Sequence, residues 1–206
     1  PTNSAVLRPA RDDPAVAVMG ACGGLLATRG KVLAGMFSGF GICLGTAVGS
    51  GDPRRLPAAF SAALRYTLIL SGLGLLAALG INGLMALGNV PPRLRPSAAP
   101  YLILSFAGAG ATAAKLLLMV LLQAVGDTGY FSALAVLGAV TNTALVVLFI
   151  GMWKGGVAWA ALATVLTNAL LALLLLRYVR RKWPRLLRTV GPREIPGTIW
   201  LGLLQN

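Results

Sequence analysis

Few side chains in this sequence have the chemistry for catalysis or metal binding. The 206 residues include no histidine and only five acidic residues, Asp12, Asp13, Asp52, Asp127 and Glu194. All five acids lie outside the long apolar stretches. Metal sites built from histidines and carboxylates, and acid–base catalysis by paired carboxylates, are therefore not expected. Two cysteines, Cys22 and Cys43, lie in apolar surroundings, which favour packed thiols over a nucleophile. We expect no enzyme activity, no metal and no cofactor.

The candidates for function are four of the polar side chains inside long apolar stretches: Lys115, Gln123, Asn142 and Thr164. Polar groups inside a membrane are costly unless satisfied, so they often mark a path for substrate or ions. Lys115 can snorkel or pair with helix carbonyls, or it can be a counter-charge that favours an anionic or zwitterionic substrate. Gln123, eight residues on, falls roughly on the same side of that helix.

These residues must be positioned by segments long enough to cross a membrane. The chain is 57% hydrophobic and only 11% charged, whereas a soluble domain is about 45–50% apolar and about 25% charged. One span needs about 20 apolar residues. The sequence therefore predicts an all-α polytopic transmembrane helix bundle, with five spans near residues 32–50, 63–88, 98–125, 130–153 and 157–177.

The other parts of the chain are shorter. We expect a polar tail or loop at 1–13, the transmembrane bundle at 14–177, a basic cytoplasmic linker at 178–196 and the truncated start of a further span at 197–206. The apolar run 14–28 is too short to span alone, so it either lengthens the first span or lies flat in the interface. The sequence is interpreted as a fragment of a longer protein.

The first span is rich in glycine. Gly41 and Gly45 stand four residues apart, on one face of a helix. Small residues at this spacing let two membrane helices approach closely. The spacing predicts a helix–helix contact at both positions.

The formal net charge of +13 is explained by residues that flank the spans rather than by a nucleic-acid partner. Lysines and arginines are concentrated on the cytoplasmic side of membrane proteins. One side of the predicted topology carries ten, Arg54, Arg55, Arg65, Arg177, Arg180, Arg181, Lys182, Arg185, Arg188 and Arg193. The other carries five, Arg8, Arg11, Arg93, Arg95 and Lys154. The turns around Asp52 and Asp127 are therefore predicted to face the cytoplasm.

Several short motifs occur in an order that resembles a known family. They are Gly49-Ser50-Gly51-Asp52, Gly126-Asp127-Thr128, Asn142 with Leu145, Gly156-Val157 and Ala160-Ala161-Leu162-Ala163-Thr164. Together they resemble the amino-terminal lobe of a multidrug and toxic compound extrusion (MATE) transporter, over roughly residues 16–188. The resemblance implies a lobe that lacks its first helix, and a second lobe beyond this chain.

The resemblance also implies a function. A transporter of this family exports small organic solutes against H⁺ or Na⁺ by alternating access, and its Asn142 and Thr164 equivalents face the cavity of this lobe. One departure is important, because members often carry an aspartate four residues after that asparagine, where this sequence has Val146. No carboxylate in this chain can then supply the coupling chemistry.

Alternatives remain open. One is a flippase for lipid-linked precursors in the same superfamily, and another is a non-transporting membrane subunit. The expected partners are the lipid bilayer, a small organic solute and a coupling H⁺ or Na⁺. The membrane is either the plasma membrane or an organellar one, such as that of a plastid.

Asn142 and Thr164 are predicted to face each other across two consecutive antiparallel spans. Asn142 lies 12 residues before Lys154, and Thr164 lies eight residues after Gly156. Those spacings correspond to depths of about 18 Å and about 12 Å from the turn. The two side chains would differ in depth by about one helical turn and would line a polar cavity.

The predicted topology can be tested with single cysteines. We expect Arg55→Cys to be protected from an impermeant thiol reagent added outside and Lys154→Cys to react with it, because the charge asymmetry puts them on opposite sides. Equal labelling of both positions from outside would contradict the topology.

Overall fold

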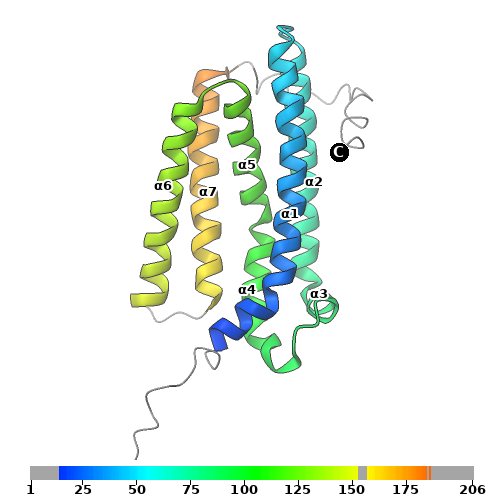
Figure 1. Ribbon diagram of the computed structural model, residues 1–206, viewed down its shortest axis with the longest axis vertical. Helices are drawn as coiled ribbons and strands as arrows, with labels where there is room; N and C mark the ends of the chain where they lie inside the picture. Colours follow the sequence, from blue (N-terminus) through cyan, green and yellow to red (C-terminus); the bar gives the residue numbers. More distant parts are fainter. Residues whose placement is uncertain (1–13, 153–156, 185, 187–206) are drawn as a thin grey trace, which may run out of the picture.

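The computed structural model describes residues 14–152, 157–184 and 186. Within these residues all regular structure is helical: α1 (Pro14–Gly49), α2 (Arg55–Leu79), α3 (Ile81–Leu87), η2 (Pro92–Leu94), α4 (Arg95–Ala107), α5 (Ala109–Ala124), α6 (Thr128–Val146), the π-helical η3 (Val147–Met152) and α7 (Val157–Lys182) (Figure 1). Five segments are long and apolar enough to cross a membrane: Ala17–Gly49, Arg55–Leu79, Pro92–Ala124, Thr128–Ile150 and Val157–Lys182. The predicted all-α bundle of five spans is confirmed.

The apolar run 14–28 lengthens the first helix. It is continuous with the rest of α1, which has 36 residues and would be about 54 Å long if straight, more than a bilayer core of about 30 Å. Figure 1 shows this first part of α1 bending across α4. Val18 and Cys22 are buried there, in a cluster with residues of α3 and α4. The extension is therefore held by packing against the bundle.

The second span differs from the prediction of 63–88. Helix α2 begins at Arg55, directly after the turn at Asp52, and ends at Leu79. Gly80 separates it from the short helix α3, and Asn89 beyond that helix has a positive φ of 53°. Glycine and asparagine favour such breaks. Apolar composition continued through the break, and the sequence prediction therefore placed this span too late.

The third span is divided at Gly108, between α4 and α5. A Cβ atom at Gly108 would lie 2.2 Å from Val165 Cγ2 of α7, which no side chain could accommodate without a shift. Glycine at this position therefore allows α7 to approach the junction closely.

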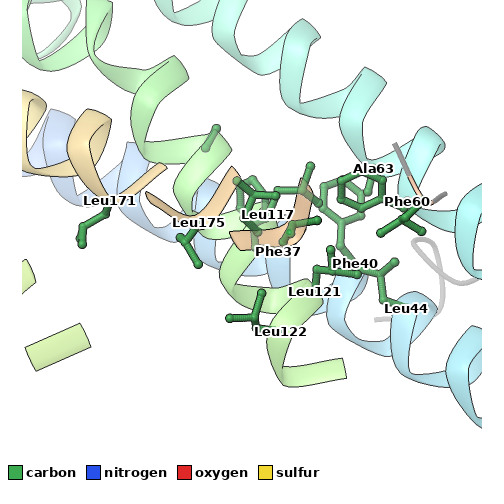
Figure 2. Close-up of a cluster of buried hydrophobic side chains, with 14 of the residues drawn as sticks. Phe37, Phe40, Leu44, Phe60, Ala63, Leu117, Leu121, Leu122, Leu171 and Leu175 are labelled. Atoms are coloured by element: carbon green, nitrogen blue, oxygen red, sulfur yellow. The ribbon is translucent and has the colours of Figure 1, made fainter. Parts of the chain in front are cut away.

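Helix α5 lies at the centre of the packing, between α1, α2 and α7. Figure 2 shows the main buried cluster, with Phe37, Phe40 and Leu44 of α1, Phe60 and Ala63 of α2, Leu117, Leu121 and Leu122 of α5, and Leu171 and Leu175 of α7. Large apolar residues are also exposed on the outside, as at Leu79 (84%) and Leu173 (65%). A bundle with apolar surfaces both inside and outside is suited to lipid, where association depends on close packing.

The predicted glycine contact is found at only one of its two positions. A Cβ atom at Gly41 would meet Val120 Cγ1 of α5 at 3.5 Å, an ordinary van der Waals distance. A Cβ atom at Gly45 would meet no described atom within 4 Å. The expected contact at Gly45 is therefore absent from the described residues, because no described side chain lies opposite this position. The tightest glycine contacts among the described residues are elsewhere, at Gly108 between α4 and α5, at Gly138 of α6 and at Gly74 of α2.

Gly74 of α2 provides a stability test. A Cβ atom there would lie 2.7 Å from Ala109 Cβ and 2.8 Å from the Phe106 carbonyl oxygen, neither of which can move freely. We expect Gly74→Ala to lower the free energy of unfolding by about 1–3 kcal/mol. Thermal unfolding in detergent would measure it. The control is Gly72→Ala in the same helix, where a Cβ atom meets nothing within 4 Å. Equal stability of the two variants would contradict this packing.

Candidate functional site

A cavity of about 770 Å³ lies between α1, α4, α5 and α7. Its volume is within the range of about 300–1,000 Å³ that is typical of small-molecule sites. Much of its wall is apolar, with Leu33 and Phe37 from α1 and Leu116 and Val120 from α5. Thr112, Leu116, Val120 and Gln123 recur at helical spacing, so one face of α5 forms one side of the cavity.

Arg29 of α1 is the basic residue on the cavity wall, and neutral groups hold its guanidinium. Its Nη1 donates a hydrogen bond to the carbonyl oxygen of Ser105, and its Nη2 donates to Thr112 Oγ1 at 3.5 Å. The guanidinium also lies 5.9 Å from the ring centroid of Phe106. Each of these partners belongs to α4 or α5, so Arg29 joins α1 to the divided third span.

The break at Gly108 explains why a carbonyl is free for Arg29. The last carbonyls of a helix have no partner within that helix. Helix α4 ends at Ala107, and the Leu104 carbonyl accepts from the amide of Gly108 at 2.9 Å. The Ser105 carbonyl accepts from Arg29 instead. The same break that admits α7 therefore creates the acceptor that binds the arginine.

Thr112 extends this contact to α7. Its Oγ1 donates to the Gly108 carbonyl at 3.2 Å and accepts from Asn168 Nδ2 at 3.0 Å. Asn168 is 7% exposed, and this bond occupies its amide in the bundle interior. The hydroxyl of Thr112 therefore connects Arg29 of α1 with Asn168 of α7.

Two of the four predicted site residues lie on the cavity wall. Thr164 of α7 is exposed to the cavity, and its Oγ1 donates to the carbonyl oxygen of Ala160 in its own helix at 3.1 Å. Gln123 lies near the carboxyl end of α5. Gly41 also borders the cavity, opposite Val120. The threonine and the glutamine thus line the same space from different helices.

Asn142 is not on the cavity wall, and the predicted pairing with Thr164 is not formed. The register between α6 and α7 is set where Gly138 meets Leu171, because a Cβ atom there would lie 2.6 Å from Leu171 Cδ1. One turn along α6 leads from Gly138 to Asn142, and one turn back along α7 leads from Leu171 to Thr167. Asn142 is therefore level with Thr167. Its Oδ1 is buried and has no hydrogen-bond partner among the described residues.

Lys115 is also absent from the cavity wall. It is partly buried on α5 and makes no hydrogen bond or ion pair with the residues that the structure describes. Leu116, the next residue, does line the cavity, about 100° further round the helix. The expectation that Lys115 and Gln123 share one functional side is therefore not met.

Sequence reasoning missed Arg29, Thr112 and Asn168. Arg29 was left outside the spans, because the first span was predicted to begin at residue 32. Asn168 follows Thr164 by four residues and so shares its side of α7. This spacing was the signal that could have identified the second polar position of that helix.

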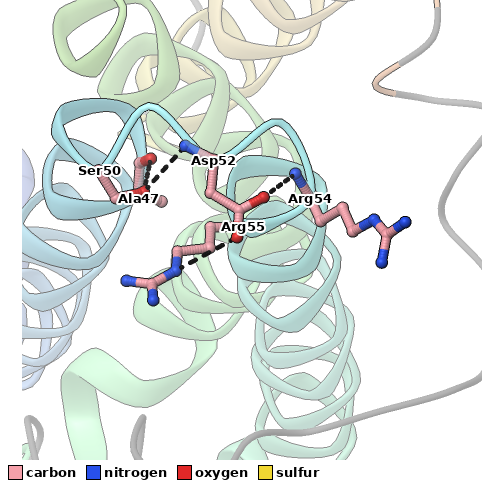
Figure 3. Close-up of polar contacts among 5 residues, drawn as sticks. All are labelled: Ala47, Ser50, Asp52, Arg54 and Arg55. Atoms are coloured by element: carbon pink, nitrogen blue, oxygen red, sulfur yellow. Dashed lines mark hydrogen bonds and ion pairs between the residues drawn. The ribbon is translucent and has the colours of Figure 1, made fainter.

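The turn at Asp52 organises the start of α2 (Figure 3). Ser50 Oγ donates to the Ala47 carbonyl at 2.8 Å, and the amide of Arg54 donates to Asp52 Oδ1 at 2.9 Å. Arg55 Nε lies 3.6 Å from Asp52 Oδ2, in an exposed ion pair. Such a pair contributes little to stability. The carboxylate of Asp52 therefore stabilises the turn mainly by accepting the hydrogen bond from the amide of Arg54.

The turn at Asp127 is fixed to the end of α7. Asp127 Oδ2 accepts from Tyr178 OH at 2.6 Å and from Lys182 Nζ at 2.7 Å. The rings of Tyr130 and Tyr178 stack with centroids 3.7 Å apart. The hydrogen bonds from Lys182 and Tyr178 hold the pKa of Asp127 below its usual range, since they stabilise the carboxylate form.

Both turns lie at the same end of the bundle. Figure 1 shows the α1–α2 and α5–α6 connections together with the end of α7 at one end. A second cavity of about 690 Å³ there is bordered by Asp52, Val125 and Lys182. The two aspartates are thus placed on one side of the membrane-length helices, as the charge pattern predicted.

This architecture is that of MATE transporters. The chain superposes on a crystal structure of a proline-to-alanine MATE mutant with a TM-score of 0.82 and 21% identity, over 94% of this chain. It superposes on an inward-facing multidrug resistance MATE family transporter of the MOP superfamily with a TM-score of 0.80 and 21% identity, over 93% of this chain. The chain spans 44% of the length of each. No family model and no curated protein matches the sequence. The chain therefore has a MATE-like fold.

The contacts of Asp127 predict a pH dependence. An aspartate whose pKa is lowered by folding stabilises the protein above its unfolded pKa of about 3.9, and that contribution is lost as the pH falls through the folded pKa. We expect Asp127→Asn to lower the melting temperature in detergent at pH 7, and the difference from the unmodified protein to shrink below about pH 4.

The control for this test is Asp52→Asn, at the other turn of the same end. Its ion pair with Arg55 is exposed and longer, so we expect a smaller effect at pH 7. If the melting temperatures of Asp127→Asn and the unmodified protein differ by the same amount at pH 7 and pH 3, the charge of Asp127 contributes nothing to stability.

Proposed function

We propose that this chain forms the greater part of one lobe of a secondary transporter that exports small organic solutes against H⁺ or Na⁺ by alternating access. The observation that carries the proposal is the cavity of about 770 Å³ in a MATE-like fold. Transporters built from two related bundles bind their substrate near the middle of the membrane and expose the site to each side in turn. A first helix and a second lobe would complete the protein, in agreement with the 44% of each solved structure that the chain spans.

The coupling group of such a transporter would lie outside the described residues of this chain. The cavity wall carries neither aspartate nor glutamate. Val146 stands at a position where MATE transporters, which this sequence resembles, often have an aspartate. A carboxylate that binds H⁺ or Na⁺ would therefore be supplied by another part of the complete protein.

A flippase for lipid-linked precursors is the second candidate. Arg29 favours it, because it gives the cavity the positive charge that a phosphate-bearing lipid would require. A non-transporting membrane subunit is less well supported, since such a protein has no need of a cavity of this size. In each case the protein would be a multi-pass component of the plasma membrane or of an organellar membrane, with both aspartate turns in the cytoplasm.

Thr164 and Asn142 test the transport function. We expect Thr164→Val to reduce transport and leave stability nearly unchanged, because its hydroxyl faces the cavity and bonds only to its own helix. Asn142 lies off the cavity wall, and its buried Oδ1 makes no hydrogen bond with the described residues, so we expect Asn142→Ala to leave stability nearly unchanged. The family resemblance is the reason to expect that this change also reduces transport. The complete reading frame, reconstituted in proteoliposomes, would be tested for H⁺- or Na⁺-driven movement of anionic, neutral and cationic fluorescent solutes.

Thr46→Val is the matched control. Thr46 of α1 also bonds to its own helix, with Oγ1 donating to the Ile42 carbonyl at 3.0 Å, and it is exposed away from the cavity. Transport by this variant should match that of the unmodified protein. If the Thr164 and Asn142 variants lose thermal stability but retain transport, the two residues stabilise helix packing and do not line the path of substrate or ions.

A further inference from the structure

Arg29 binds its partners well inside the membrane-length helices. Thr112 precedes the end of α5 at Ala124 by 12 residues, and Asn168 precedes the end of α7 at Lys182 by 14. These spacings place them about 18 Å and about 21 Å from the cytoplasmic end. The guanidinium that bonds to Thr112 is therefore within the depth of the hydrocarbon core and not at the cytoplasmic surface.

The positive charge of Arg29 has no negative partner among the described residues. Its contacts are a carbonyl oxygen, a hydroxyl group and an aromatic ring. The described acids are Asp52 and Asp127, which bind Arg55 and Lys182 at the cytoplasmic end. An arginine inside a membrane is costly unless its charge is compensated. The structure thus holds a cation in place without neutralising it.

The free donors of this cation are available to the cavity. A guanidinium has five N–H groups, and the hydrogen bonds to Ser105 and Thr112 occupy two of them. Tyr101 and Thr164 border the cavity with Arg29 and add hydroxyl groups. Arg29 is the basic residue among those that line the cavity, so the positive charge of the cavity is concentrated there.

The rest of the wall suits an apolar body. Phe37, Leu116 and Val120 line the cavity away from Arg29, toward Gln123. A ligand that satisfied both regions would carry one compact anionic group and a hydrocarbon or aromatic part. Arginine matches a carboxylate especially well, because its planar fork can donate two parallel hydrogen bonds.

We propose that this cavity selects amphipathic organic anions and that Arg29 binds their carboxylate. The inference rests on the proposed transport function and specifies its substrate class. Thr112 positions the guanidinium, and Asn168 holds Thr112 in place. An organic cation of the same shape is disfavoured, because the wall places a fixed positive charge beside it and no carboxylate.

A matched set of probes tests this selectivity by binding. Pyrenebutyrate is the anion, pyrenebutanol the neutral analogue and pyrenebutylammonium the cation, and all three share one apolar body. With the complete reading frame in detergent, we expect pyrenebutyrate to bind about tenfold or more tightly than the ammonium analogue. Arg29→Gln should remove that preference, and Arg29→Lys should retain part of it.

Two further variants separate binding from folding. Lys31→Gln removes an exposed charge from the same helix and should leave the preference unchanged. Thr112→Val is the alternative test if Arg29→Gln fails to fold. It keeps Arg29 but removes an acceptor of its guanidinium, so it should weaken the preference for pyrenebutyrate. If Arg29 instead pairs with a carboxylate elsewhere in the complete protein, Arg29→Gln will lower the melting temperature and leave relative probe affinities unchanged. Equal affinities of the three probes for the unmodified protein would also overturn the proposal.

The outcome for transport is distinguishable from the outcome for binding. Gradient-driven movement of the cationic probe, unaffected by Arg29→Gln, would keep the transporter and reject the anion site. Arg29-dependent binding of pyrenebutyrate without transport of any probe would keep the anion site and reject the transporter.

Discussion

The contact between Gly108 and α7 is the constraint on which the site depends. Because Gly108 has no Cβ, Val165 can approach the junction of α4 and α5. The helix break at this junction leaves the Ser105 carbonyl for Arg29, and the close approach brings Asn168 within 3.0 Å of Thr112. A side chain at Gly108 would separate α7 from the junction. The effect would then extend to the hydrogen bonds that join α1, α5 and α7.

Hydrogen bonds between helices account for a larger share of the stability of a bundle in lipid than in water. Membrane helices gain little from hydrophobic burial against one another, because the lipid tails are equally apolar. The described bundle therefore depends on close glycine contacts, as at Gly74 and Gly138, and on polar links between helices. At the end of the bundle that carries both aspartate turns, Asp127 ties the α5–α6 turn to Tyr178 and Lys182 of α7. Inside the bundle, Thr112 provides the corresponding link.

The sequence predicted the architecture well, because length and apolar composition are direct requirements of a membrane span. Five spans and an all-α bundle were found, and both aspartate turns lie at one end. The second span was placed too late because α2 and the short helix α3 beyond Gly80 are both apolar, so composition did not separate them. Whether 14–28 belonged to the first span was also undecidable, since Arg29 and Lys31 interrupt the apolar run. In the structure, α1 tolerates Arg29 because α4 and α5 supply acceptors for it.

The candidate site was harder to predict, for a geometric reason. Periodicity shows which residues share one side of a helix, but not which side faces which neighbour. Thr164 and Gln123 were candidates by their polarity inside apolar stretches, and the structure places both on the cavity wall. Asn142 and Lys115 were equally good candidates by composition, yet their sides of α6 and α5 lie away from it. The pairing of Asn142 with Thr164 was inferred from depth alone, whereas the contact of Gly138 with Leu171 sets a register that puts Asn142 opposite Thr167.

For the proposed transporter, the distribution of charge separates two tasks, substrate binding and ion coupling. Both described acids are bound to basic residues at one end of the bundle, and the described cavity wall carries an arginine without an acid. A group that exchanges H⁺ or Na⁺ must be able to lose its cation, which a carboxylate can do and an arginine, with its very high pKa, cannot. In this lobe the cavity is therefore suited to binding an anion and not to releasing a coupling ion. Coupling would then require a carboxylate from another part of the protein, close enough to Arg29 that its change of charge alters the affinity for the bound anion.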